Sequence, residues 1–153
     1  MIYLASDHAG YQLKEDIKDF LGENGIDYID MGPETYERLD DYPDYIIPAA
    51  EKVAENPEEH KGIVFGGSGQ GEAVAANKVR GIRAVVYCIR GEMDEEAVRL
   101  TREHNDANIL SIGAGFVKPE VAKQVVSLWL ETPFPGEERH ARRIEKIRKY
   151  EAE

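Results

Sequence analysis

The sequence predicts an α/β fold in which helices cover both faces of a parallel sheet. Short apolar runs alternate along the chain with segments of helical periodicity. Strands and helices that alternate in this way form parallel sheets with right-handed crossovers. The length of 153 residues suits one domain, so we expect residues 1–153 to form a single domain. The expected strands are Ile2–Ala5, Ile26–Met31, Gly62–Phe65, Ile82–Tyr87 and Asn108–Ile112.

The first three expected helices are marked by their apolar faces and their end signals. The first stops at Asn24-Gly25, and the third begins at a glycine-rich loop and includes Ala73–Lys78. The second runs from about Tyr42-Pro43 to Asn56-Pro57, with Pro48 inside it as a candidate kink. The apolar face of the first consists of Leu13, Ile17, Phe20 and Leu21.

The remaining helices follow the fourth and fifth strands. One places Met93, Ala97, Leu100 and His104 along one face. The next starts at Lys118-Pro119 and carries Val121, Val125, Leu128 and Trp129. A final charged helix covers roughly Glu137–Tyr150.

Charge and composition limit the classes of partner. The net charge is -11, from 19 Lys and Arg against 30 Asp and Glu, so nucleic acid and anionic membranes are poor candidates. The single cysteine, Cys88, excludes an intramolecular disulfide. The chain opens directly into a strand, and its apolar runs are too short to span a bilayer. We therefore expect a cytoplasmic protein.

Ligands of parallel α/β sheets bind beyond the carboxyl ends of the strands, so the residues that follow each strand are the first candidates. Ser6-Asp7-His8 follows the first strand. Ser or Asp there could simply cap the following helix, with His8 a bystander. The position favours a functional role, because it places a carboxylate and an imidazole side by side at the binding edge.

The segment Gly66–Glu72 follows the third strand and has four glycines in its first six residues. Glycine lets a ligand approach the main chain closely, and free amides at the start of the next helix attract anions. The dinucleotide pattern G-x-G-x-x-G fails because Glu72 occupies the third glycine position. The Walker A pattern fails because Glu72 replaces its lysine, and a carboxylate there would repel a triphosphate.

These features predict an anion cradle with its own carboxylate. Such a loop suits proton abstraction next to a carbonyl, with Glu72 as the base. The loop amides and Ser68 would hold the developing enediolate oxygen. The alternative is a tight strand–helix turn with Glu72 in the first helical turn. It is less favoured, because a simple turn does not need four glycines.

Other candidates lie farther along the chain. Cys88 is best interpreted as a buried core residue, whereas His104 fits either a core histidine or an acid–base group. Arg139 and Arg143 lie four residues apart on the last helix and could hold a phosphate. The histidines are scattered and no metal-ligand motif occurs, so we expect no metal and no cofactor.

The sequence resembles the ribose-5-phosphate isomerase B family, which also contains galactose-6-phosphate isomerase subunits. The resemblance covers essentially the whole chain. The segments that carry it are Ser6–Gly10, Asp41-Tyr42-Pro43, Gly66–Glu72, Ala75–Lys78, Gly81–Ala84, Arg102–Asn105 and Arg139-His140-x-x-Arg143.

The resemblance implies a Rossmann-like three-layer α/β/α sandwich and a homodimer, or a dimer of dimers, with each active site built across the subunit interface. The C-terminal helix, at about 137–150, would contribute to the dimer and the phosphate site. The reaction implied is metal-free aldose–ketose interconversion through a cis-enediolate.

The resemblance also implies residue roles. Glu72 would be the base, in place of a cysteine that many members carry at the position of Gly66. His104 would assist ring opening, with Asp7 nearby. Ser68 and the loop amides would form the anion hole. The residues implied to contact the sugar phosphate are His8, Tyr42, Gly67, Gly69, Gly71, Asn105, Arg139 and Arg143.

One departure concerns the substrate. Many members have a phosphate-binding arginine shortly after the fifth strand, where this chain has Gly115. Lys118 or Arg142 could compensate. Ribose 5-phosphate and ribulose 5-phosphate are the default substrate pair, and a tetrose or hexose phosphate is the alternative. A third hypothesis is a non-catalytic phosphosugar-binding or nucleotide-binding module, since fold alone does not fix function.

Overall fold

The computed structural model describes all residues from 1 to 153 and contains one five-stranded sheet, in which every pairing is parallel. The strands lie in the order β2-β1-β3-β5-β4. Their bounds are β1 (Ile2–Ser6), β2 (Tyr28–Asp30), β3 (Lys61–Gly66), β4 (Ala84–Tyr87) and β5 (Ile109–Gly113). The sheet confirms the predicted fold class.

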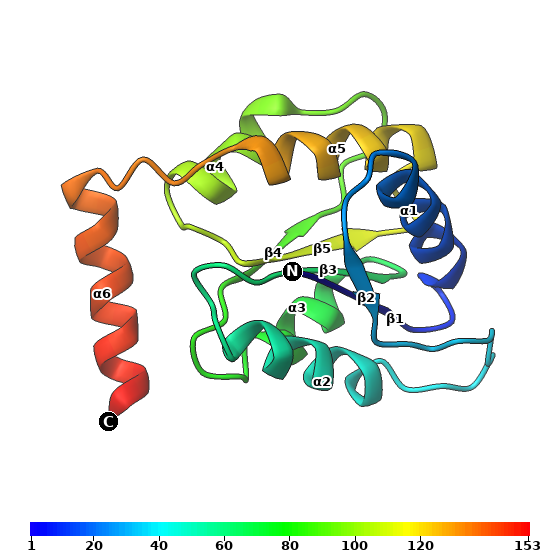
Figure 1. Ribbon diagram of the computed structural model, residues 1–153, viewed down its shortest axis with the longest axis horizontal. Helices are drawn as coiled ribbons and strands as arrows, with labels where there is room; N and C mark the ends of the chain where they lie inside the picture. The colour runs from blue at the N-terminus through cyan, green and yellow to red at the C-terminus, as the bar shows by residue number, and fades with distance from the viewer.

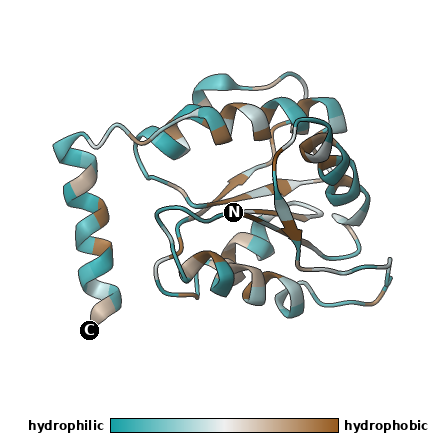
Figure 2. Ribbon diagram, viewed as in Figure 1, coloured by the Kyte–Doolittle hydropathy of each residue, from teal (hydrophilic) through white to brown (hydrophobic).

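Helices cover both faces of the sheet (Figure 1). On one face α1 (Tyr11–Glu23), α4 (Glu95–Glu103) and α5 (Pro119–Glu131) enclose a core that includes Phe65 and Trp129. On the other face α2 (Pro43–Ala54) and α3 (Gln70–Ala76) enclose a second, smaller core. The outward surfaces of these helices are largely hydrophilic (Figure 2). This two-sided burial makes β1 and β5 apolar runs with no exposed face.

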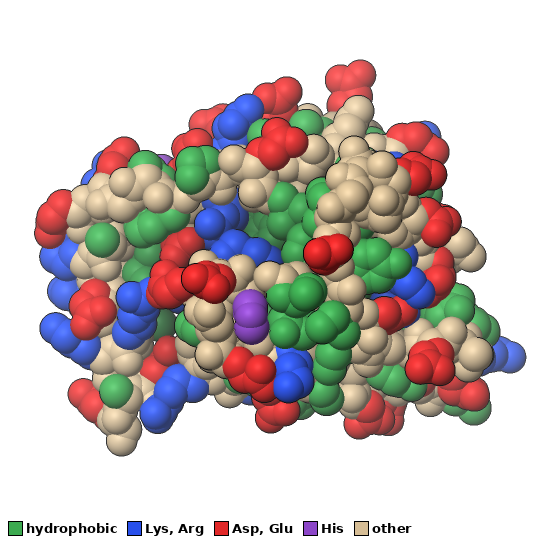
Figure 3. Space-filling view, in the orientation of Figure 1, with side chains coloured by type: hydrophobic (Ala, Val, Ile, Leu, Met, Phe, Trp, Pro, Cys, Tyr) green, Lys and Arg blue, Asp and Glu red, His purple; other side chains and the backbone are tan.

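The last helix, α6 (Glu138–Ala152), stands apart from these layers. It lies beside the end of the sheet at which the strands begin (Figure 1). His140 and Ile144 are its buried residues, whereas Ile147 and Tyr150 remain exposed. Many of the Lys and Arg side chains visible in Figure 3 lie along the edge formed by this helix. No helix of the structure has both the length and the apolar character that crossing a membrane requires.

Several predicted boundaries were wrong by a few residues. Met93 precedes α4, because the Asp94 side chain accepts a hydrogen bond from the Ala97 amide at 2.9 Å and caps the helix there. The predicted third helix ended at Lys78, but α3 ends at Ala76. The Asn77 side chain instead bonds the backbone of Ala84 ahead of β4. Pro48 lies inside α2, which continues through it as one helix.

The register of the central strands brings their carboxyl ends together. Ser6 pairs with Phe65, and Gly66 pairs with Gly113. The segments that follow β1, β3 and β5 therefore emerge side by side at the end of the sheet where the strands finish, which we call its carboxyl edge. The segment after α4 lies at the opposite edge, because it leads into the start of β5.

Candidate active site

The glycine loop between β3 and α3 offers a row of unused backbone amides. The N–H groups of Gly67, Ser68, Gly69 and Gly71 donate to no carbonyl or side chain of the protein. Gly69 has a φ of 78°, a conformation that favours glycine. Its carbonyl accepts a 2.7 Å hydrogen bond from the buried Ser111 hydroxyl on β5, which fixes the loop. Such a loop can bind a negatively charged oxygen.

Glu72 lies behind this loop, and its residue is only 4% exposed. The carboxylate packs against the backbone of Gly66 so closely that a Cβ at that position would overlap it. Burial raises the pKa of Glu72, and the charge of Asp7 raises it further, against a hydrogen bond from its own backbone that lowers it. A carboxyl group with a raised pKa is a better proton acceptor at neutral pH than an ordinary glutamate.

Tyr42 and Asp7 complete the surroundings of the loop. The Tyr42 ring lies against Gly71, where a Cβ would come within 2.9 Å of its Cζ atom. Asp7 is buried, and its Oδ1 accepts a 3.1 Å hydrogen bond from the Gly10 amide. Asp7 therefore supports the turn into α1 and also acts electrostatically on Glu72. Helix α1 itself begins after Gly10 and has no side-chain cap, so the predicted capping role is limited to this bond in the preceding turn, and a role of Asp7 in the reaction stays a prediction.

His8 is bound to a partner that the sequence interpretation missed. Its Nδ1 lies 2.7 Å from Asp40 Oδ1, and its backbone amide donates to the same oxygen at 2.9 Å. The hydrogen bond to Asp40 raises the pKa of His8, desolvation lowers it, and the charge of Asp7 raises it further. Asp40 lies 32 residues away along the chain, so no local pattern could have indicated the pair.

Asp7, His8 and Asp40 are also close enough to share an ion, since their candidate ligand atoms all lie within 4.8 Å of one another. The spacing of the histidines did not indicate this cluster. In the structure the His8 Nδ1 atom is occupied by its hydrogen bond to Asp40, and one Asp7 oxygen is occupied by the Gly10 amide. The cluster is therefore arranged as a hydrogen-bonded group.

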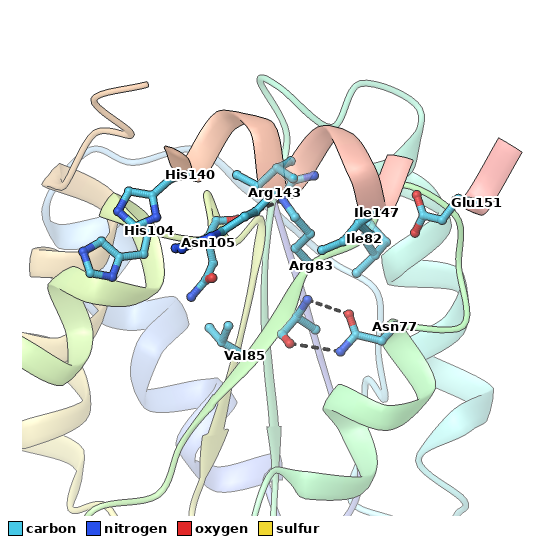
Figure 4. Close-up of a pocket in the computed structure, with 12 residues that line it drawn as sticks. Asn77, Ile82, Arg83, Val85, His104, Asn105, His140, Arg143, Ile147 and Glu151 are labelled. Carbon is cyan, nitrogen blue, oxygen red and sulfur yellow. Dashed lines mark hydrogen bonds between the residues drawn. The ribbon is translucent and has the colours of Figure 1, made fainter. Parts of the chain in front are cut away.

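The other predicted residues gather at the opposite edge of the sheet. His104, Asn105, His140 and Arg143 line a cavity of about 530 Å³ beneath α6. Figure 4 shows these side chains together with Arg83, on the far side from the β3–α3 loop. We call these four residues the amino-edge cluster. We call Asp7, His8, Tyr42 and Gly66–Glu72 the carboxyl-edge cluster.

Two histidines form the centre of the amino-edge cluster. The rings of His104 and His140 stack with centroids 4.1 Å apart and an interplanar angle of 17°. Burial lowers the pKa of His140, and the positive charges of His104 and Arg139 lower it further. The buried His140 Nε2 has no hydrogen-bond partner. A positive charge on the neighbouring ring would repel a protonated His140, so the arrangement favours the neutral form of the His140 imidazole.

Arginines border the same cavity. Arg143 lines it, whereas Arg139 is exposed and its Nε lies 3.3 Å from Glu137. Arg142 pairs with Glu138 at 2.7 Å. Positive charge therefore collects on α6, as the sequence predicted, but only Arg143 faces the cavity.

The predicted site residues thus form two clusters, which one chain holds at opposite edges of its sheet. None of the three cavities in the chain is lined by Glu72. The buried Glu72 and the adjacent glycine loop therefore lie outside these cavities, away from His104 and Arg143.

Gly115 lies directly against the glycine loop. Its amide donates to the Gly67 carbonyl at 2.9 Å, and a Cβ at Gly115 would come within 3.0 Å of that oxygen. The following residue, Phe116, carries the Arg90 guanidinium over its ring at 4.4 Å. Arg90 is an exposed cation that the sequence interpretation did not single out. Its position makes it a better candidate than Arg142 for replacing a charge lost at Gly115.

The chain matches known proteins over nearly its whole length. Residues 2–147 match the family model described as Ribose/Galactose Isomerase. Ribose-5-phosphate isomerase B of Mycolicibacterium paratuberculosis is 40% identical over 151 residues, which cover 98% of this chain and 91% of that protein.

Solved structures are similarly close. The structure of ribose-5-phosphate isomerase B from Mycoplasma genitalium with bound ribulose-5-phosphate has a TM-score of 0.92 and 38% identity, over 99% of this chain and 96% of that one. The Clostridium thermocellum ribose-5-phosphate isomerase B structure has a TM-score of 0.89 and 43% identity, over 99% and 97%.

Proposed function

Because the chain belongs to the Ribose/Galactose Isomerase family, we propose that it interconverts ribose 5-phosphate and ribulose 5-phosphate. The observation that carries this proposal is the buried Glu72 carboxylate beside a loop with unused amides. The ligand in the Mycoplasma genitalium structure supports the choice of substrate pair.

The proposed chemistry follows from the carboxyl-edge cluster. Glu72 removes the proton from C2 of the open-chain aldose, and the electrons move to the carbonyl oxygen to give a cis-enediolate. The free amides of the glycine loop, with Ser68, stabilise the negative oxygen where it develops. A proton passes from the C2 hydroxyl to the C1 oxygen, and the protonated Glu72 returns its proton to C1, which leaves the carbonyl at C2 and yields the ketose.

The remaining roles are assigned to both clusters. Asp7 and His104 assist opening of the sugar ring. His8, Arg139 and Arg143 bind the phosphate, and Asn105 and Tyr42 contact the sugar. The two clusters lie at opposite edges of one sheet, so we propose a homodimer, or a dimer of such dimers, in which each site combines the clusters of two chains. We also propose a cytoplasmic setting for the protein, as the sequence led us to expect.

The base assignment is tested with Glu72→Gln. The amide keeps the shape of the side chain but cannot accept the proton. We expect kcat with ribose 5-phosphate to fall at least about a hundredfold, while the far-UV spectrum and the binding of ribose 5-phosphate remain. Near-normal turnover by the variant would show that another group is the base.

Two alternatives are separated by substrate tests. Gly115 and the adjacent Arg90 motivate a panel of tetrose, pentose and hexose phosphates. A higher kcat/KM for a tetrose or hexose phosphate would replace the pentose assignment. A non-catalytic binding module predicts no deuterium incorporation from heavy water next to the carbonyl of any of these sugars. Catalysis predicts incorporation that is lost in Glu72→Gln.

A further inference from the structure

His8 and Asp40 are joined by two hydrogen bonds that end on the same carboxylate oxygen, which is more than a simple ion pair requires. One carboxylate oxygen of Asp40 accepts both the backbone amide and the ring Nδ1 of His8, at 2.9 and 2.7 Å. Two hydrogen bonds from one residue to one atom fix the orientation of the imidazole as well as its position. They also place a proton on Nδ1, because the Asp40 carboxylate can only accept.

The other end of the imidazole is left available. His8 Nε2 forms no hydrogen bond within the chain, and the side chain is 36% exposed. His8 also lies in the carboxyl-edge cluster, next to Asp7. A ring held at Nδ1 and free at Nε2 can offer one directed N–H to a ligand.

The burial of Asp40 explains why this ring should be charged. The Asp40 side chain is only 4% exposed, and its Oδ2 is buried without any hydrogen-bond partner. A buried carboxylate in this state is stabilised by an adjacent positive charge. His8 is the partner in its single ion pair. Asp7 adds a second carboxylate that acts on the imidazole and favours the same charge.

We propose that Asp40 is a positioning residue that holds His8 as an imidazolium, with its Nε2–H directed to an anionic phosphate oxygen of the substrate. This inference rests on the proposed function for the identity of the substrate. Asp40 itself touches no substrate and acts through His8. The connection between β2 and α2, which carries Asp40, therefore becomes part of the phosphate site.

The first test is the variant Asp40→Asn, which keeps an acceptor for the His8 amide but removes the charge. At a pH above 6.5 but below the raised pKa of His8, as located by the titration described below, the KM for ribose 5-phosphate should rise up to about tenfold, with kcat changed by less than about twofold, because a binding contact is lost. At about pH 6 the two KM values should converge, since the imidazole of the variant is protonated there without help.

A matched control is Glu37→Gln. Glu37 is an exposed carboxylate on the same connection and forms no ion pair, so this variant removes one negative charge from the surface alone. Its KM should follow that of the parent protein at both pH values. A KM rise in Asp40→Asn that is equal at both pH values would overturn the proposal, because Asp40 would then act only on the shape of the loop.

An NMR titration tests the effect of Asp40 on His8 directly, without a measurement of enzyme activity. The chain has four histidines, and His8→Gln identifies the His8 ring signal by its loss. The His8 ring should titrate above pH 6.5, the ordinary value for histidine, in the parent protein, and at lower pH in Asp40→Asn than in the parent. Inorganic phosphate should shift the His8 Nε2 signal.

These results distinguish a failure of the proposed isomerase function from a failure of the proposed His8–Asp40 pairing. If ribose 5-phosphate is not isomerised but the titration shows the expected shift, the proposed function fails and the pairing stands. If the His8 ring of the parent protein titrates at or below pH 6.5, the pairing is wrong whatever the substrate. That measurement on the parent protein also decides the case if Asp40→Asn does not fold.

Discussion

Gly66 and Glu72 compete for one volume at the carboxyl edge of the sheet. The glutamate side chain occupies the space that any Cβ at position 66 would need. A side chain at Gly66 and a carboxylate at Glu72 therefore exclude each other in this backbone. This competition accounts for the glycine at position 66 in a chain whose proposed base is Glu72.

Gly66→Ala is the sharpest test of that competition. The added methyl group would displace the Glu72 carboxylate, and a misplacement of about 1 Å can cost about a hundredfold in rate. We expect kcat to fall by about that factor, as measured with ribose 5-phosphate. Gly22→Ala is the control, because a Cβ at Gly22 on α1 meets nothing within 4 Å. Unchanged kcat in Gly66→Ala would mean that the position of this carboxylate is not critical.

The raised pKa of Glu72 predicts a specific pH dependence. The base works only when ionised, so kcat/KM falls as the pH drops through its pKa. Since burial and Asp7 raise that pKa above 4.5, the acid limb should lie above the value for an ordinary glutamate. Asp7→Asn removes one of the two causes and should move the limb to lower pH, whatever its effect on the maximum rate. A limb that stays in place would show that Asp7 does not act on the base.

The residues that the sequence predicted well are those with a local signal. The glycine loop and Glu72 form one continuous segment, so composition and spacing were enough to propose an anion cradle with a base. Asp40 had no such signal, because its role depends on a contact with a residue 32 positions away. The stacking of His140 on His104 is likewise a product of packing between α4 and α6.

At the scale of elements, periodicity located every strand and helix but not all of their ends. The errors fall where side chains bond the backbone, as with Asp94 at the start of α4 and Asn77 after α3. The periodicity of apolar residues indicates which face of an element is buried, but it contains no information on hydrogen bonds between side chains and the backbone. The connection from β2 to α2 is fixed in the same way, by Lys14 on α1.

Lys14→Met tests how that connection is held. The fully buried ammonium group donates to Asp30 at 2.6 Å and to the Pro33 carbonyl at 2.9 Å. Methionine would remove the donor to the Pro33 carbonyl and one of the two lysine partners of Asp30, so we expect a loss of about 2 kcal/mol in the free energy of unfolding, measured in urea. Lys18→Met is the matched control. Lys18 also contacts Asp30 but is partly exposed, and its loss should be below about 1 kcal/mol. Equal losses would contradict the anchoring role of Lys14.

At the scale of the whole molecule, the order of the strands determines which residues can share a site. The segments after β1 and β3 meet because those strands are neighbours, which brings the charge of Asp7 close to Glu72. The prediction of a parallel sheet placed both residues after the carboxyl ends of strands but did not include the order of the strands. His104 and Arg143 lie at the other edge because α4 returns the chain to the start of β5 and α6 packs there. Within one chain the clusters stay apart, so the site that we propose, which combines them, needs a second copy of the chain.

Mixing two inactive variants tests that requirement. Glu72→Gln removes the base from the carboxyl-edge cluster, and His104→Asn removes the imidazole from the amino-edge cluster. If a site combines the clusters of two chains, a mixed dimer has one site with both changes and one with neither. After random exchange of chains, half of the dimers are mixed, so about a quarter of the parent activity should return. Each variant exchanged with itself is the control. Activity that stays at the level of the separate variants, in a mixture shown by mass spectrometry to have exchanged, would place both clusters of a site on the same chain.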